Sequence, residues 1–226
     1  MFFICKICKS EIELDKCHIH KSACIINKCE LIRYECPICG VIFGTLNMIN
    51  GTVEYIKKAY EFCDTVWKEG DGARFELPTF MSLKPSKEKE YLNFGAGNSS
   101  STIKTLTEQG YKVWGYEPYL PTALPNIIRS KEELAKRKFD GIISSNLIEH
   151  LQDPVQDLIF MKSLLKDKTS QMAHATACYE LRYEFSLYHL YFFLGKSVEY
   201  MSKNAGLSAV KTIHEGEFIS YLYSQI

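Results

Sequence analysis

The stretch YLNFGAGNSSSTIKTLTEQGYKVWGYE, residues 91–117, constrains the fold more than any other part of the chain. It predicts an apolar strand that runs into Gly95-Ala96-Gly97, a helix that begins at Ser99–Ser101, and a second strand from Lys112 to Tyr116. The two glycines let the backbone turn tightly and lie against a ligand, because they carry no Cβ. Strand, glycine turn, helix and strand together predict the first unit of a nucleotide-binding α/β fold.

Glu117 closes the second of these strands, twenty residues after Gly97. At that spacing a carboxylate can accept the hydroxyl protons of a ribose. Two ligands fit the pattern, a dinucleotide and S-adenosylmethionine, and a strand-to-helix turn without a ligand is the third interpretation. Ser100 stands where the dinucleotide pattern has its last glycine. This favours S-adenosylmethionine without deciding the matter, because that ligand has no diphosphate to bind.

A second segment, FDGIISSNLIEHLQDP at residues 139–154, extends the pattern. Together with the glycine loop and Glu117, it resembles class I S-adenosylmethionine-dependent methyltransferases, in particular the small-molecule group, over about residues 87–226. The resemblance implies an α/β, Rossmann-like fold with a seven-stranded sheet and a closing hairpin, here predicted at Ala209–His214 and Glu217–Ser224. Ligands of such sheets bind at the carboxyl ends of the strands. The residues expected to border the cofactor are Asn93, Gly95, Ala96, Gly97, Glu117, Pro118, Ser145 and Asn146.

The chain departs from the family pattern at two positions of the glycine loop. Asn93 stands where the family usually has an acid, and Ser99 stands where it has the last glycine. Ser99 is a good helix N-cap. Asn93 can accept a hydrogen bond but carries no charge to offset the amino group of the cofactor, so modest cofactor affinity is expected. If both changes mark a degenerate domain, the chain binds a partner and is not a catalyst, which is one alternative function.

Seven of the nine cysteines lie in the first 39 residues. Cys5-x-x-Cys8 and Cys36-x-x-Cys39 have the paired spacing of a zinc ribbon, in which four thiolates hold one structural Zn²⁺. A disulfide framework is the competing interpretation, disfavoured in a cytosolic protein. The segment Tyr34–Phe43 resembles the ribbon that precedes some bacterial sugar and natural-product methyltransferases. The residues between the two pairs that could also ligate metal are Cys17, His18, His20, Cys24 and Cys29.

These signals divide the chain into a zinc-ribbon module at residues 1–45, a helical linker or lid at 46–86, and the methyltransferase domain at 87–226. The linker is predicted to form a helix because its apolar residues recur at intervals of three or four. Those residues are Val53, Ile56, Tyr60, Cys63 and Trp67.

A hydroxyl or carbon-acid acceptor must lose a proton, and a histidine can accept it near neutral pH. His189 lies in LYHLYFF, which resembles a family segment that often meets the substrate, and His150 lies in the EH pair. These two are the leading candidate bases, and Glu180 is a weaker candidate. His174 falls within a predicted fifth strand at Ser170–Cys178 and is expected to be buried structure. The aromatic residues of 179–193 predict either a pocket wall or a homodimer interface.

Composition favours a small-molecule acceptor over a nucleic acid. Lys plus Arg and Asp plus Glu both number 27, and no long basic run is present. No stretch reaches the ~18 apolar residues of a membrane span, and the first residues lack a signal-peptide pattern, so a cytoplasmic protein is expected. The leading function is methyl transfer from S-adenosylmethionine to a small molecule, and resemblance suggests a sugar or nucleotide-sugar. RNA methylation with the ribbon as an RNA clamp is the alternative.

Overall fold

The computed structural model describes residues 1–25, 28–51, 70–97, 101–119 and 124–226. The predicted helix at Val53–Trp67, with Tyr60 and Cys63, lies outside these residues, as do Ser99 and Ser100. Within the described part, no helix is both long enough and apolar enough to span a bilayer.

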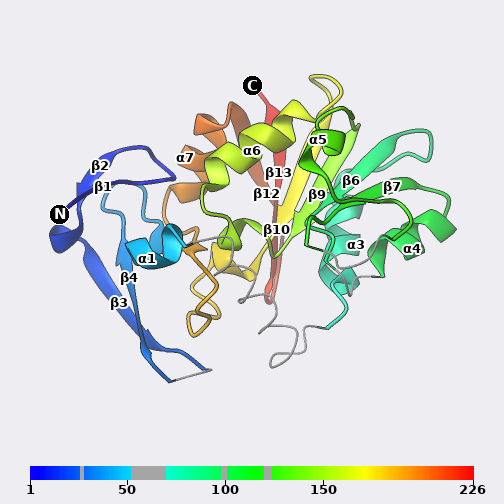
Figure 1. The fold of residues 1–226 in the computed structure, drawn as a ribbon. Helices are drawn as coiled ribbons and strands as arrows, with labels where there is room; N and C mark the ends of the chain where they lie inside the picture. Colours follow the sequence, from blue (N-terminus) through cyan, green and yellow to red (C-terminus); the bar gives the residue numbers. More distant parts are fainter. Residues whose placement is uncertain (26–27, 52–69, 98–100, 120–123) are drawn as a thin grey trace.

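A seven-stranded sheet forms the centre of the molecule, with the order β12-β13-β10-β9-β6-β7-β8 (Figure 1). Five strands are parallel, and β13 pairs antiparallel with both β10 and β12. The closing hairpin and the seven-stranded Rossmann-like sheet are therefore confirmed. The strands are β6 (Glu90–Phe94), β7 (Lys112–Tyr116), β8 (Ile127–Ile128), β9 (Gly141–Ser145), β10 (Gln171–Ala175), β12 (Leu207–Glu215) and β13 (Phe218–Gln225).

Helices cover both faces of this sheet, which explains why residues that point to either face of its central strands are buried. Tyr91 and Ile143 belong to the hydrophobic cluster under α3 (Ala73–Ser82) and α4 (Thr102–Glu108). Their neighbours in the chain, Leu92 and Ile142, belong to the cluster on the opposite face, under α6 and α7. The remaining helices of the sheet domain are α5 (Lys131–Leu134), α6 (Pro154–Ser163) and α7 (Ser197–Asn204).

Local sequence signals set the ends of several elements. Asp153 caps α6 by accepting a 3.2 Å hydrogen bond from the Gln156 N–H, and Pro154 occupies the first turn. Strand β10 ends at Ala175, three residues before the predicted end at Cys178. The reason is that Thr176 caps a short 3₁₀ helix, η4 (Ala177–Tyr179), by accepting from the Cys178 N–H at 3.0 Å.

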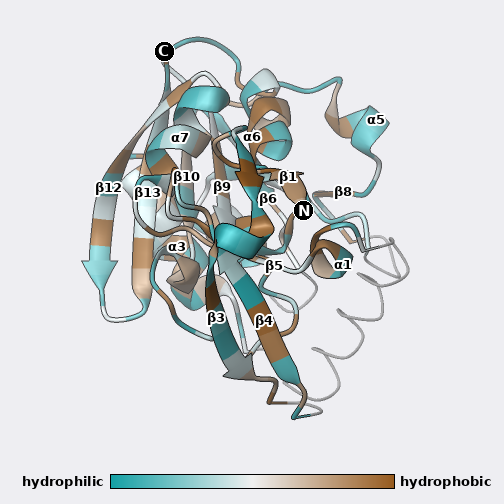
Figure 2. Ribbon diagram, turned by 90° about the vertical axis from the view of Figure 1, so that its left-hand side faces the viewer, coloured by the Kyte–Doolittle hydropathy of each residue, from teal (hydrophilic) through white to brown (hydrophobic). Residues whose placement is uncertain are grey.

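The cysteine-rich N-terminal segment forms two small sheets. Strands β1 (Phe2–Ile4) and β2 (Glu11–Glu13) pair with each other, and a 3₁₀ turn, η1 (Leu14–Lys16), follows. The second sheet has the order β11-β5-β4-β3, and its two long strands extend away from the large sheet (Figure 2). Its strands are β3 (His18–Ala23), β4 (Glu30–Glu35), β5 (Ile42–Gly44) and β11 (Tyr191–Phe192), and the helix α1 (Leu46–Ile49) follows β5.

Strand β11 joins the N-terminal segment to the large domain, because it comes from the far end of the chain. Tyr191 pairs with Phe43 and Phe192 pairs with Ile42. The Cys39 carbonyl accepts a 2.8 Å hydrogen bond from the Lys196 N–H, next to the loop that leads into α7. Buried side chains of both regions also belong to one hydrophobic cluster. The N-terminal segment and residues 190–198 thus share a sheet and a core.

Candidate active site and metal centre

The glycine loop turns sharply at the carboxyl end of β6. Gly95 and Gly97 have φ of +79° and +62°, in the left-handed region that favours glycine. The Tyr116 carbonyl accepts hydrogen bonds from the N–H groups of Gly95 and Ala96, at 2.9 and 3.1 Å. A Cβ on Gly95 would lie 2.9 Å from the Leu147 side chain, so the loop packs directly against the segment that follows β9. The positive φ therefore favours glycine at 95, and the Leu147 side chain would have to shift to admit a Cβ.

Glu117 faces this loop from the end of β7. Its carboxylate accepts 3.2 Å hydrogen bonds from the N–H groups of Gly97 and Tyr119. Burial raises the pKa of Glu117, and the two N–H donors oppose that shift. The neighbouring Pro118 is exposed. Glu117 and the glycine loop therefore form one side of a site whose groups suit a ribose.

Asn93 is fully buried at the start of the same turn. Its side-chain amide donates a 2.9 Å hydrogen bond to the carboxylate of Glu76, which is 4% exposed. Asn93 Oδ1 has no hydrogen-bond partner among the described residues, and the same holds for Ser145 Oγ at the end of the adjacent strand β9. Asn146 follows with a φ of +48° and donates its N–H to the Ala175 carbonyl at 2.8 Å. Buried acceptors without a partner are uncommon and fit a site that awaits donors from a ligand.

Sequence reasoning missed Glu76. Ala73, Glu76 and Phe80 recur at intervals of three and four in α3, so the spacing places Glu76 on the buried face of the helix. A buried carboxylate on an apolar helix face is rare and often functional. The start of α3 is also fixed, because the Asp71 carboxylate accepts 3.0 Å hydrogen bonds from the N–H groups of Ala73 and Ser101.

The candidate bases His150 and His189 lie side by side, beyond β9 and just before β11. Their ring centroids are 5.0 Å apart at an interplanar angle of 63°. His150 lies in a 3₁₀ turn, η3 (Ile148–His150), and its Nδ1 lies 2.9 Å from the Tyr188 carbonyl. His189 Nδ1 lies 3.5 Å from the thiol of Cys178. Burial lowers the pKa of His189 well below its ordinary value, and electrostatic interactions with His150 and Arg33 add to the shift.

The structure does not bring Glu180 to this histidine pair. Its carboxylate forms 2.8 Å ion pairs with Arg182 and His214 instead. The hydrogen bond from Arg182 is the main reason that the pKa of Glu180 is lowered, which weakens it as a base. His174 is buried as expected, in contact with Ser144, and burial lowers its pKa to about 3.

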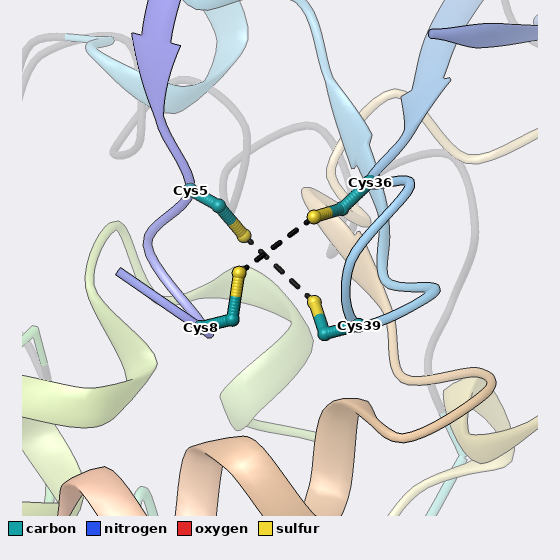
Figure 3. Close-up of side chains that lie close together, drawn as sticks. All are labelled: Cys5, Cys8, Cys36 and Cys39. Atoms are coloured by element: carbon teal, nitrogen blue, oxygen red, sulfur yellow. Dashed lines mark hydrogen bonds between the residues drawn. The ribbon is translucent and has the colours of Figure 1, made fainter. Parts of the chain in front are cut away.

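The four cysteines of the two predicted pairs come together and are all buried (Figure 3). Cys5 Sγ lies 3.9 Å from Cys39 Sγ, and Cys8 Sγ lies 3.7 Å from Cys36 Sγ. These separations are far beyond a disulfide bond. A tetrahedron with metal–sulfur bonds of ~2.3 Å has edges of ~3.8 Å, so the four thiols already have the dimensions of a zinc site.

The two pairs have matching backbone geometry. The Cys5 carbonyl accepts a 2.9 Å hydrogen bond from Lys9 N–H, and the Cys36 carbonyl accepts one of the same length from Gly40 N–H. Lys9 and Gly40 both have positive φ, 62° and 76°. Each Cys-x-x-Cys stretch thus closes a tight turn that directs its two thiols to one centre. The other candidate ligands, Cys17, His18, His20, Cys24 and Cys29, are not part of this cluster among the described residues.

Two other groups of side chains have ligand atoms within 4.8 Å of one another, namely His18, His20 and Glu35, and Glu149, His150 and His189. In the first group, His20 Nε2 lies 2.9 Å from Glu35 Oε2. In the second, the Thr176 hydroxyl donates to Glu149. The positive charge of Arg33, whose Nη2 lies 3.4 Å from the His189 carbonyl, opposes a cation at this second group.

A family model described as a methyltransferase domain matches residues 66–212, which is more than half of the chain. The chain belongs to this methyltransferase family. The predicted class, an S-adenosylmethionine-dependent methyltransferase, is thereby confirmed. A search of curated protein sequences finds no match.

Solved methyltransferases share the fold at low sequence identity. The Burkholderia thailandensis 1,6-didemethyltoxoflavin-N1-methyltransferase, solved with 1,6-didemethyltoxoflavin and S-adenosylhomocysteine, is 12% identical with a TM-score of 0.60, covering 92% of this chain and 99% of that one. The glycopeptide N-methyltransferase MtfA with sinefungin is 11% identical with a TM-score of 0.52, covering 70% and 88%. A possible histamine N-methyltransferase from Thermotoga maritima is 17% identical with a TM-score of 0.50, covering 75% and 96%.

Proposed function

We propose that this methyltransferase transfers a methyl group from S-adenosylmethionine to a small-molecule acceptor at the carboxyl ends of β6, β7, β9 and β10. The observation that carries the proposal is the Glu117 carboxylate bonded to the Gly97 N–H across the glycine loop. Two buried acceptor atoms on the adjacent strands β6 and β9, Asn93 Oδ1 and Ser145 Oγ, add support because they lack partners among the residues that the structure describes.

We assign each part of the cofactor to the group whose chemistry suits it. Glu117, beside Pro118, would accept hydrogen bonds from the ribose hydroxyls. The backbone of Gly95, Ala96 and Gly97 would lie against the ribose and methionine portions. The amino end would meet the acceptors at the ends of β6 and β9, which are Asn93, supported by the Glu76 carboxylate, and Ser145 with Asn146.

When bound, S-adenosylmethionine supplies a methyl carbon that its sulfonium already activates. The protein then has to align an acceptor atom with that carbon, exclude water and take up a proton. An imidazole nitrogen of His189 would take up the proton that the acceptor loses when it is methylated. Its lowered pKa keeps the His189 ring neutral at neutral pH, so a ring nitrogen is free to accept the proton, and the same shift makes it a weaker base than an ordinary histidine. His150, at 5.0 Å between ring centroids, is the neighbouring histidine that can assist.

A sugar or nucleotide-sugar is the acceptor class that we propose to test first. Its support is the resemblance of residues 34–43 to the ribbon of sugar and natural-product methyltransferases. A hydroxyl acceptor also loses a proton on methylation, and His189 would be the base that accepts it. The aromatic residues between 179 and 193 would supply apolar walls, and one of them, Tyr179, is buried.

We further propose that Cys5, Cys8, Cys36 and Cys39 hold one Zn²⁺. The sulfur separations of 3.7 and 3.9 Å support this ligand set. Four protein ligands leave no open position, so the ion would be structural. Reduced thiols suit a reducing compartment such as the cytoplasm. In this arrangement residues 1–45 form the metal module, 46–86 the linker and 87–226 the catalytic domain.

The direct test is a methyl-transfer assay on the purified full chain with isotopically labelled S-adenosylmethionine. The acceptor panel should hold free sugars, nucleotide-sugars, nitrogen heterocycles and total RNA. We expect acceptor-dependent formation of S-adenosylhomocysteine with a small molecule and loss of most turnover in His189→Asn. Label in RNA, with none in any small molecule, would contradict the proposal.

A further inference from the structure

Arg33 is a buried cation in the middle of β4, with 2% of its surface exposed. Its guanidinium donates to three backbone carbonyls of one loop, those of Glu184 at 2.7 Å, Ser186 at 2.5 Å and His189 at 3.4 Å. It also donates to the Ser22 hydroxyl on β3 at 3.2 Å. It also lies over the Phe192 ring, 5.1 Å from the centroid. Burial lowers the pKa of Arg33 to about 10. A charged group buried in this way is costly unless its hydrogen bonds are satisfied. The loop carbonyls and the Ser22 hydroxyl accept hydrogen bonds from Nη1 and Nη2, while Nε has no partner among the described residues.

The loop that Arg33 binds carries His189 and has no helix or strand of its own between residues 181 and 190. The N-terminal segment holds it at further points. The Ser22 hydroxyl donates to the Glu184 carbonyl at 2.8 Å, and the Gly44 N–H donates to the Leu190 carbonyl at 2.9 Å. On the opposite side, the Leu190 N–H donates to the Glu149 carbonyl at 2.7 Å. The position of His189 thus depends on residues of β3, β4 and β5.

We propose that Arg33 is a positioning residue for His189. Through Arg33, the cysteine-rich N-terminal segment contributes to the acceptor site. The proposal rests on the proposed function, because His189 takes up the acceptor proton there. The planar guanidinium can hold several carbonyls at fixed angles, which an ammonium cannot do. A small misplacement of a catalytic group costs a large factor in rate.

Arg33 also acts on His189 through its charge. The groups that face His189 are His150 from η3, Cys178 from η4, Arg33 from β4, Tyr183 from the same loop and the carboxylate of Glu149. Burial raises the pKa of Cys178 well above its ordinary value, so this thiol stays neutral. Arg33 is therefore a permanent positive charge beside the imidazole, and its removal should make the imidazolium easier to form.

The test compares Arg33→Met, Arg33→Lys and the control Arg137→Met in the full-length, zinc-loaded protein. Arg137 also stacks on an aromatic ring, 3.6 Å from the centroid of Trp114, but lies away from the His189 loop. We expect Arg33→Met to lower kcat roughly 10- to 100-fold with unchanged affinity for S-adenosylmethionine, and to move the acid limb of the pH–rate profile to higher pH. Arg33→Lys should lower kcat but leave that limb in place, because the charge remains. Arg137→Met should change neither.

Two measurements without turnover keep the inference separate from the proposed function. NMR titration should show a higher His189 pKa in Arg33→Met than in the wild type, and hydrogen exchange should become faster at residues 184–190 in both Arg33 variants. Failure of the wild type to bind S-adenosylmethionine would refute the proposed function while these two measurements still test Arg33. If Arg33→Met does not fold, the Arg33→Lys comparison decides. A folded Arg33→Lys protein with wild-type kcat and wild-type exchange would overturn the inference.

Discussion

The side-chain amide of Asn93 donates a 2.9 Å hydrogen bond to the Glu76 carboxylate, and both side chains are buried. Asn93 occupies the position where related chains carry an acid, and Glu76 brings a carboxylate to that position from α3. A carboxyl group is therefore present at this position, but on a different element. We propose that Glu76 supplies the charge that faces the amino group of the cofactor, so that Asn93 does not weaken cofactor binding.

Exchanging these two side chains tests whether the charge matters more than the element that carries it. Glu76→Gln should weaken binding of S-adenosylmethionine roughly tenfold or more, because it removes a charged partner. Asn93→Asp should destabilise the protein, since it places two carboxylates in contact. The double variant Asn93→Asp/Glu76→Gln should recover much of both losses. Calorimetric titration and thermal unfolding measure these effects, and a double variant no better than its parents would contradict the account.

Gly95 is predicted to be irreplaceable for a steric reason. An added Cβ would lie 2.9 Å from Leu147 in a backbone of φ +79°. We expect Gly95→Ala to cost ~1–3 kcal/mol of stability and to abolish measurable cofactor binding. Gly216→Ala is the matched control, because its φ is +59° but nothing lies within 4 Å of the added Cβ. Equal cofactor affinity in the two variants would contradict the proposed loop.

The pH dependence of turnover should show the unusual state of His189. A base must be unprotonated, so kcat at saturating S-adenosylmethionine should fall as the pH drops through the pKa of His189. Because that pKa lies well below 6.5, the rate should stay flat across neutral pH and decline only in clearly acidic solution. A pH–rate profile on the wild type and on His150→Asn measures this. A decline centred at or above the ordinary histidine pKa would argue against His189 as the base.

The four-cysteine centre should dominate the stability of the N-terminal segment. Structural zinc contributes ~10–16 kcal/mol in small modules, so Cys36→Ser should lose the ion and lower the melting temperature strongly. Cys29→Ser makes the same chemical change at an exposed cysteine outside the cluster and should retain the metal. Elemental analysis and thermal unfolding compare the two. Stoichiometric zinc in folded Cys36→Ser would show that these four residues are not the ligand set.

Sequence reasoning succeeded where chemistry depends on local spacing. The glycine loop, Glu117 at the end of the next strand and the two Cys-x-x-Cys turns are short patterns, and the seven-stranded sheet is what the resemblance to class I methyltransferases implies. The sequence alone does not predict contacts between segments that are far apart in the chain. Arg33 meets the Ser186 carbonyl 153 positions away, and β5 pairs with β11 from the far end of the chain. Nothing in the spacing of residues 1–45 indicates those partners.

The assignment of buried polar groups was limited for a related reason. From the sequence, Asn93 indicates that a negative charge is lost from the glycine loop. Its partner Glu76 lies on α3, outside the glycine-loop motif, so the motif alone does not show that contact. The end of β10 at Ala175 was also missed, since an apolar run continues through it and only the Thr176 cap turns the backbone. Both differences arise from side-chain hydrogen bonds that compete with the pattern of apolar residues.

Calorimetric titration of S-adenosylmethionine into the wild type and Glu117→Gln tests the central claim most directly. Glu117 accepts from Gly97 and Tyr119, and the substitution removes the charge while keeping the shape. We predict binding to the wild type that weakens at least tenfold in the variant. Binding to the wild type should also weaken as the pH falls through the raised pKa of Glu117. No binding to the wild type, or equal affinity in both proteins, would contradict the account.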